Sequence, residues 1–259
     1  MKVSIITSCY NRHSVVRKAI ESVLAQDYPD IEYIVVDGNS TDGSMDIIHE
    51  YRDRISRIVC EPDNGMYEAI NKGIRAATGD IVGLLHSDDC FYDPHTISEV
   101  VEAFKNSKAE MVYGNGLFVN ERDTERIVRK WISGKYSRKA VRWGWLPLHP
   151  TVYMKRDCFE KVGMYDENYR IAADTDFLVR CLYNQHLKVH YLDRFIVKMR
   201  MGGLSTDPKL CRRKWSEDIK QYKANGIPPA LRHYIRSCNQ CKEKLKNTRS
   251  LMKKREIPW

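Results

Sequence analysis

The sequence of 259 residues lacks long apolar runs and two common nucleotide-binding motifs. No apolar stretch approaches the ~20 residues that a membrane-spanning helix needs, and no N-terminal segment has the pattern of a secretory signal. Neither G-x-G-x-x-G after the first predicted strand nor G-x-x-x-x-G-K-[ST] occurs, which excludes the dinucleotide fingerprint and the P-loop. The sequence therefore predicts a cytoplasmic protein that holds any phosphate group by other means.

The eight cysteines do not form an evident disulfide or metal framework. They are scattered through strand-like and helix-like segments, which is typical of reduced thiols. Cys238 and Cys241 form the single C-x-x-C pair, whereas a zinc site would need a second pair. Because the same spacing places both on one helical face, we interpret them as packing residues.

Basic residues are concentrated at the C-terminus. Residues 207–259 contain 15 Lys and Arg against 5 Asp and Glu, which leaves 28 against 29 for residues 1–206. This shift predicts a near-neutral catalytic body, residues 1–205, and a basic helical segment, residues 206–259.

The basic segment predicts two amphipathic helices separated by Pro228 and Pro229. Apolar residues share one face of each helix, and Lys and Arg occupy the others: Trp215, Ile219 and Tyr222 in the first, and Leu231, Tyr234, Ile235, Cys238 and Leu245 in the second. One interpretation is binding to an anionic membrane surface. The other is that two solvated helices cover the body, and the sequence leaves both open.

The body alternates β-branched runs with amphipathic stretches about 25 residues apart, as right-handed βαβ units require. The predicted strands are Val3–Thr7, Ile31–Asp37, Ile55–Cys60 and Asp80–Leu85, and the helical faces fall within Val16–Leu24 and Met66–Ala77. This pattern predicts an α/β fold with a mostly parallel sheet flanked by helices.

Polar residues collect where the predicted strands end, which is the ligand-binding edge of open α/β sheets. They are Ser8, Tyr10 and Asn11 after the first strand, Asp37 at the end of the second, and Asp88 and Asp89 after the fourth. For Asp37 the alternative is turn chemistry leading into a helix capped by Thr41 or Asp42. Two adjacent carboxylates suit Mg²⁺ or Mn²⁺, with diphosphate oxygens completing the coordination.

Taken in order, several segments of the body resemble family 2 glycosyltransferases of the GT-A fold. The resemblance extends from the N-terminus to about Ser205 and rests on Val3–Asn11, Ser22–Tyr28, Ile34–Gly43, Asn71–Gly73, Ala77–Asp80 and Leu85–Asp89. It implies a GT-A sheet and transfer of a sugar from a nucleotide-diphosphate donor.

The resemblance also implies roles for single residues of the donor site. Asp88 would contact the ribose region, Asp89 would hold Mn²⁺ or Mg²⁺, Asp37 would bind the nucleobase with Tyr10 beside it, and Thr7 or Ser8 would line the pocket. This chain has His86 where many relatives have Asp or Asn. His86 either adjusts the site or packs.

A second segment, Tyr169–Arg180, resembles the family's E-D-x-D motif, with Ala173 in place of the glutamate. The match assigns the catalytic base to Asp174. An inverting transfer needs such a carboxylate to take the proton of the attacking hydroxyl. The alternative is that Asp174 and Asp176 only favour a helix N-terminus.

Two further segments are candidates for substrate contacts. Trp143, Trp145 and His149 could form an acceptor platform, or belong to an apolar loop packed on the sheet. In Lys198–Ser205, the family likeness suggests a loop over the donor diphosphate, with Arg200 contacting phosphate.

The sequence thus predicts a metal-dependent inverting glycosyltransferase that uses a nucleotide-sugar donor, with UDP as the expected nucleotide. By family analogy the acceptor is a hydroxyl of a growing, lipid-linked glycan at the inner face of a membrane. A nucleotidyltransferase is the alternative enzyme, although Ser8–Arg12 is not its glycine-rich phosphate loop. A nucleic-acid-binding or lipid-binding protein would explain the basic segment but not the clustered aspartates; no nucleic-acid partner is expected.

Overall fold

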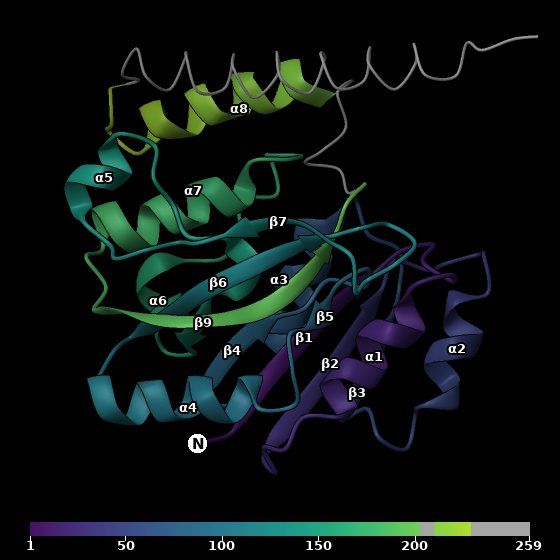
Figure 1. Ribbon diagram of the computed structural model, residues 1–259. Coiled ribbons are helices and arrows are strands. Elements are labelled where there is room, and N and C mark those ends of the chain that lie inside the picture. Colours follow the sequence, from purple (N-terminus) through teal and green to yellow (C-terminus); the bar gives the residue numbers. More distant parts are fainter. Residues whose placement is uncertain (203–209, 229–259) are drawn as a thin grey trace, which may run out of the picture.

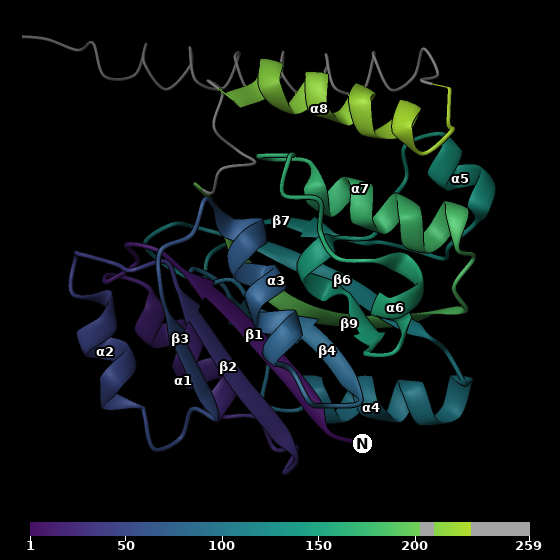
Figure 2. The same ribbon diagram turned by 180° about the vertical axis from the view of Figure 1, so that it is seen from behind.

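The computed structural model describes residues 1–202 and 210–228. Its centre is a nine-stranded sheet in the order β3-β2-β1-β4-β8-β6-β9-β5, with β7 paired to β6, and helices cover both faces (Figures 1 and 2). The strands are β1 (Val3–Cys9), β2 (Ile31–Asp37), β3 (Arg57–Cys60), β4 (Ile81–Leu84), β5 (Cys90–Phe91), β6 (Met111–Val119), β7 (Ile127–Trp131), β8 (Tyr153–Lys155) and β9 (Val189–Arg200). The helices are α1 (Val16–Leu24), α2 (Ser44–Glu50), α3 (Met66–Ala76), α4 (Thr96–Ser107), α5 (Arg138–Arg142), α6 (Cys158–Val162), α7 (Ala173–Val179) and α8 (Cys211–Ala224), with a 3-10 turn η1 (His149–Thr151) and a π-helix η2 (Arg180–Asn184).

The first half of the sheet confirms the predicted βαβ pattern. Strand β1 pairs in parallel with β2 and β4, and β2 pairs in parallel with β3. Helix α3 lies close against β1, since a Cβ at Gly73 would come within 2.3 Å of Ile6 Cγ2. Only glycine permits this approach, which gives the Asn71–Gly73 motif one physical function.

The second half of the sheet is mixed rather than parallel. Strand β8 is antiparallel to both β4 and β6, and β9 is parallel to β6 but antiparallel to β5. Within the strand-like run Thr151–Met154, strand β8 begins only at Tyr153, because His149–Thr151 forms a 3-10 turn. Pro150 lies at the start of that turn, where its missing N–H does no harm.

Two apolar clusters hold the layers together, one on each face of the sheet. One joins α1, α2 and α4 to the sheet, and the other joins α3, α6, α7 and α8. The expected side-chain cap of α2 by Thr41 or Asp42 is wrong. Gly43 precedes the helix with φ +87°, and the Asp42 carboxylate instead accepts from the Ser44 N–H at 3.0 Å.

The start of the basic segment packs on the body. Helix α8 lies against α7 (Figures 1 and 2), and Tyr222 and Ile227 are buried in the same cluster as α7. The predicted boundary near residue 205, the second helical face and the Cys238–Cys241 pair lie outside the described residues. Within the described ranges, no helix has the length and apolar character to span a bilayer.

Candidate functional site

The acidic pair occupies a tight turn after β4. The Asp89 N–H donates to the His86 carbonyl at 3.0 Å, and one Asp89 oxygen accepts from the Arg200 N–H at 3.1 Å. Asp89 is only 3% exposed, and burial together with the charge of Asp88 raises the pKa of its carboxyl well above the usual range. A buried carboxylate beside a second, half-buried one is costly unless a cation offsets their charge.

Arg200 braces the acidic turn. Its Nε donates to the Asp88 carbonyl at 3.0 Å and its Nη1 to the Glu121 carbonyl at 2.8 Å. The predicted Lys198–Ser205 loop is wrong in its first part, because β9 continues to Arg200 as a partner of β6. This pairing places Arg200 beside the acids, where two of its guanidinium nitrogens bind protein carbonyls.

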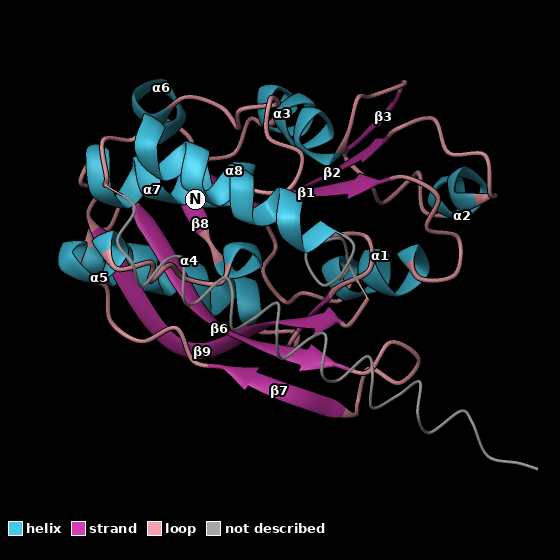
Figure 3. Ribbon diagram, turned by 90° about the horizontal axis from the view of Figure 1, so that it is seen from above, coloured by secondary structure: helices cyan, strands magenta, loops and turns pink. Residues whose placement is uncertain are grey.

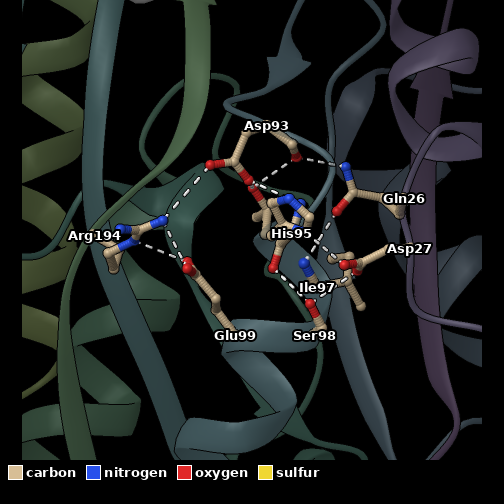
Figure 4. Close-up of polar contacts among 9 residues, drawn as sticks. Gln26, Asp27, Asp93, His95, Ile97, Ser98, Glu99 and Arg194 are labelled. Atoms are coloured by element: carbon tan, nitrogen blue, oxygen red, sulfur yellow. Dashed lines mark hydrogen bonds and ion pairs between the residues drawn. The ribbon is translucent and has the colours of Figure 1, made fainter.

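The chain that follows the acidic turn is fixed to α1 and β9. Figure 4 shows Gln26 bridging the loop before α4: its amide donates to the Asp93 carbonyl at 2.8 Å and accepts from the Ile97 N–H at 3.0 Å. Arg194 of β9 pairs with Glu99 of α4 at 2.6 Å. The Ser22–Tyr28 motif therefore has a structural function, because it holds β5 and the adjacent acids in place.

Asp37 stabilises its own loop. It is fully buried, and its two oxygens accept from the N–H and Oγ of Ser40, each at 2.7 Å. The Ser40 Oγ in turn accepts from the Asn11 N–H at 2.8 Å, which joins the loops after β1 and β2. These bonds correspond to the turn interpretation of Asp37, and a nucleobase contact would require the fully buried carboxylate to become exposed.

Tyr10 and Asp63 flank Gly38 at the same edge. A Cβ at Gly38 would lie 2.5 Å from Asp63 Oδ2 and 3.2 Å from the Tyr10 ring. Tyr10 is 58% exposed, and burial raises the pKa of the Asp63 carboxyl. The sequence analysis missed Asp63, although the turn-forming Pro62–Gly65 directly after β3 is a signal that could have found it.

Thr7 and Ser8 diverge at the end of β1. Thr7 is fully buried, and its hydroxyl accepts from Tyr33 at 3.2 Å, so its side chain packs rather than lining a pocket. Strand alternation explains the difference between the two, because Thr7 shares one buried side of β1 with Ile5 and Cys9. Ser8 is half-buried on the other face.

Asp174 lies in the first turn of α7. One of its oxygens accepts from the Thr175 N–H at 2.7 Å and from the Tyr67 hydroxyl at 3.4 Å. Tyr67 also donates to the Ile171 carbonyl at 2.8 Å, and Asn71 of the same helix α3 binds the Tyr165 backbone in both directions. Helix α3 therefore positions the segment that leads into Asp174.

Two stacked histidines lie close to Asp174, and one of them, His86, also lies close to Asp88. His86 stacks on His149 with ring centroids 6.1 Å apart, and His149 Nε2 is 2.8 Å from the Tyr165 hydroxyl. Burial lowers the pKa of His86, whereas the negative charges of Asp88 and Asp174 act to raise it. Burial likewise lowers the pKa of His149 to about 4. Since both carboxylates act on His86, the fold brings the two predicted acidic segments together.

Glu217 of α8 supports the same segment from the other side. Its carboxylate accepts from the N–H groups of Arg170, Ile171 and Ala172 at 3.2, 2.8 and 3.1 Å, and from Arg213 at 2.9 Å. Although burial opposes ionisation, these bonds lower the pKa of Glu217. No sequence motif marks Glu217, because its function depends on how α8 packs.

The predicted acceptor platform is not a single surface. Trp145 is half-buried, donates to the Ser133 carbonyl at 2.8 Å and packs edge-on against Tyr113. His149 is buried beneath His86. Of these three residues, only Trp143 is exposed, at 45%. The three side chains do not form the expected joint platform, because the Pro147–Pro150 turn directs the chain inward.

The acidic turn fits a divalent cation shared with a ligand. Among residues 1–202 and 210–228, no group of three His, Cys, Asp or Glu side chains could hold a metal ion. Asp89 and Asp88 would thus supply only part of the coordination, and hard cations such as Mg²⁺ readily take the rest from phosphate and water. This fit is favoured by Asp89, because its carboxylate is buried and the charge of Asp88 opposes its ionisation.

Comparison with known proteins identifies the family. The model for "Glycosyl transferase family 2" matches residues 4–171. The chain belongs to this family. A PGL/p-HBAD biosynthesis glycosyltransferase of Mycobacterium bovis is 29% identical over 207 residues, which cover 78% of each chain. An uncharacterized glycosyltransferase of Nostoc sp. is 31% identical over 67% of this chain and 57% of its own.

Solved structures of other proteins support the GT-A fold. Staphylococcus aureus TarS aligns over 85% of this chain with a TM-score of 0.67 and 19% identity, and the match spans 40% of TarS. The Pyrobaculum calidifontis mannosyltransferase PcManGT, solved with GDP-Man and Mn²⁺, aligns over 96% of this chain and 75% of its own, with a TM-score of 0.65 and 16% identity. The predicted α/β GT-A architecture is confirmed.

Proposed function

We propose that this family 2 glycosyltransferase is a metal-dependent, inverting hexosyltransferase that uses a UDP-sugar. The observation that carries the proposal is that the charges of Asp174 and Asp88 both act on His86, which means that the two acidic segments lie close together. One carboxylate site would hold the donor and the other would activate the acceptor. A TarS fragment solved with UDP-GlcNAc adds support for this class of donor.

The donor would lie across the ends of β1, β2 and β4. Tyr10 and Asp63 would flank the nucleobase, with Asp37 holding their loop, and Asp88 would contact the ribose. Asp89 would hold Mn²⁺ or Mg²⁺, which when bound neutralises charge on the departing diphosphate. Arg200 keeps the acidic turn in place through its bonds to Asp88 and Asp89 and is the candidate phosphate contact.

Asp174 would accept the proton of the acceptor hydroxyl as its oxygen attacks the anomeric carbon. Attack opposite the diphosphate inverts the configuration at that carbon. The Tyr67 hydroxyl and the Thr175 N–H fix the orientation of the carboxylate, which preorganises the base. Trp143 is the exposed aromatic side chain that could contact a sugar of the acceptor.

For the acceptor we propose a hydroxyl of a growing, lipid-linked glycan, with the enzyme peripheral to the inner face of the membrane. The mycobacterial relative, whose name refers to PGL/p-HBAD biosynthesis, favours such an acceptor. The cationic residues of the basic segment would favour an anionic surface.

The first test combines thermal-shift and turnover measurements on wild type, Asp89→Asn and Asp174→Asn. UDP-sugar with Mn²⁺ should stabilise wild type and Asp174→Asn but not Asp89→Asn, because Asp174 acts on the acceptor. Transfer should fall at least about 1000-fold in Asp174→Asn, since the base is lost. An active Asp174→Asn enzyme would overturn the assignment of the base, and metal-independent donor binding would overturn that of Asp89.

A further inference from the structure

The near-neutral body contains one strongly basic stretch, residues 126–143. It covers β7, the connection to α5, and α5 itself, and it has no Asp or Glu. Its seven cationic residues, all exposed, are Arg126, Arg129, Lys130, Lys135, Arg138, Lys139 and Arg142. The overall charge of the body therefore conceals a local surface of net charge +7, which we call the β7–α5 surface.

Setting Arg142 aside, six of the seven cations of this surface form no ion pair with a carboxylate of the described residues. Arg129 lies 4.9 Å from the Trp131 ring centroid, and Arg138 lies 4.2 Å from that of Tyr183. Such contacts orient a guanidinium without removing its charge, so the surface retains a positive potential.

Large apolar side chains are exposed on the same stretch. Ile127, Val128, Ile132 and Trp143 are 49%, 53%, 59% and 45% exposed, and they are four of the nine large hydrophobic residues that are exposed among residues 1–202 and 210–228. Strand β7 pairs only with β6 in that part of the chain and lies at the outer edge of the sheet (Figure 3). Cations on an edge strand can simply prevent aggregation, but that function does not require exposed Ile and Trp.

We propose that the β7–α5 surface binds the face of a bilayer that contains anionic phospholipid. Its cations would contact the headgroups, and Val128 and Ile132 would enter the interfacial region, where exposed apolar side chains are favoured. This proposal rests on the membrane location in the proposed function and deepens it, because it names a lipid-binding surface on the body. That surface would act in addition to the basic segment.

The position of this surface relative to the site supports the proposal. The hairpin between β6 and β7 contacts the acidic turn through the bond from Arg200 to the Glu121 carbonyl at 2.8 Å. At its other end, Arg138 of α5 donates to the Tyr183 carbonyl in η2, directly after α7. A membrane on this flank would lie beside the elements that hold Asp89 and Asp174, where a lipid-linked acceptor must arrive.

The test is co-sedimentation of the full chain with phosphatidylglycerol-containing vesicles. The variant Lys130→Glu/Lys135→Glu/Lys139→Glu should bind roughly 100-fold more weakly at low salt, since each cation near an anionic surface contributes on the order of tenfold or less. The matched control, Arg52→Glu/Arg57→Glu/Lys105→Glu, changes the net charge equally at exposed positions near α2, β3 and α4, away from β7 and α5 (Figure 1). It should bind within about threefold of wild type.

The apolar part is tested with Val128→Ser/Ile132→Ser, which leaves the acceptor candidate Trp143 unchanged. This variant should lose the binding that persists at high salt, where the electrostatic attraction is screened. The proposal would be overturned if the triple variant and its control lost binding equally, or if the triple variant bound as well as wild type. It would also be overturned if wild type did not bind the vesicles, or if single-stranded RNA displaced them. Stabilisation by UDP-sugar and Mn²⁺, measured in parallel, tests the donor site independently.

Discussion

His149 links the stability of the protein to pH. Its imidazole is buried against Tyr165 and His86, and its pKa is lowered to about 4, whereas an exposed histidine has a pKa near 6.5. Between these two values the unfolded chain binds a proton that the folded chain excludes. The folding free energy that depends on neutral His149 is therefore present above pH ~6.5 and is lost as the pH falls toward 4.

We predict that His149→Gln reduces this acid sensitivity. Between pH 7 and pH 5, His149 should account for about 2 kcal/mol of the decrease in the free energy of unfolding, and glutamine keeps a polar partner for Tyr165 but does not titrate. Urea unfolding at both pH values measures the difference. His49→Gln, at an exposed position of α2, serves as the control. Equal pH dependence in His149→Gln and wild type would contradict the prediction.

Among the structural elements, α7 depends on α8 for the position of its first turn. The Glu217 carboxylate accepts three successive backbone N–H groups just before Ala173. We predict that Glu217→Ala lowers stability by about 2 kcal/mol, because those donors lose a charged acceptor, and that it lowers kcat at least about tenfold with little change in donor KM. Urea unfolding and steady-state kinetics measure both effects.

Two comparisons separate positioning from general destabilisation. Arg213→Ala removes the half-exposed ion pair to Glu217 but leaves the Glu217 carboxylate as acceptor for the three N–H groups. It should lower the free energy of unfolding by less than about 1 kcal/mol. Glu217→Gln keeps an amide oxygen as acceptor and should recover part of the kcat. If Glu217→Ala lost stability but retained full kcat, α8 would not position the base.

Some helices and strands of this protein could be predicted from the sequence alone, and others could not. Strands β1, β2 and β4 and helices α1 and α3 follow from local periodicity and β-branching, and so does the edge where their loops meet. Periodicity did not reveal β9 or the antiparallel pairing of β8, because their partners are distant in the sequence. For the same reason the half-buried position of Trp145 and the contacts of Glu217 required the tertiary structure.

At the scale of the whole molecule, the charge pattern and the packing divide the chain differently. The charge pattern predicts a body that ends near residue 205, and this boundary stays a prediction. Yet Tyr222 and Ile227 are 4% and 0% exposed, in the apolar cluster that also contains Phe177 of α7. Burial of side chains of this size stabilises a fold by roughly 1.5–3 kcal/mol each.

We therefore predict that a chain truncated after Ser205 is less stable than one truncated after Pro228 by at least about 3 kcal/mol. Both lack residues 229–259, so the difference reports what residues 206–228 contribute. The free energy of unfolding in urea measures it. Equal stability would mean that α8 only covers the body, whereas the predicted loss, together with reduced transfer, would make α8 part of the catalytic unit despite its basic charge.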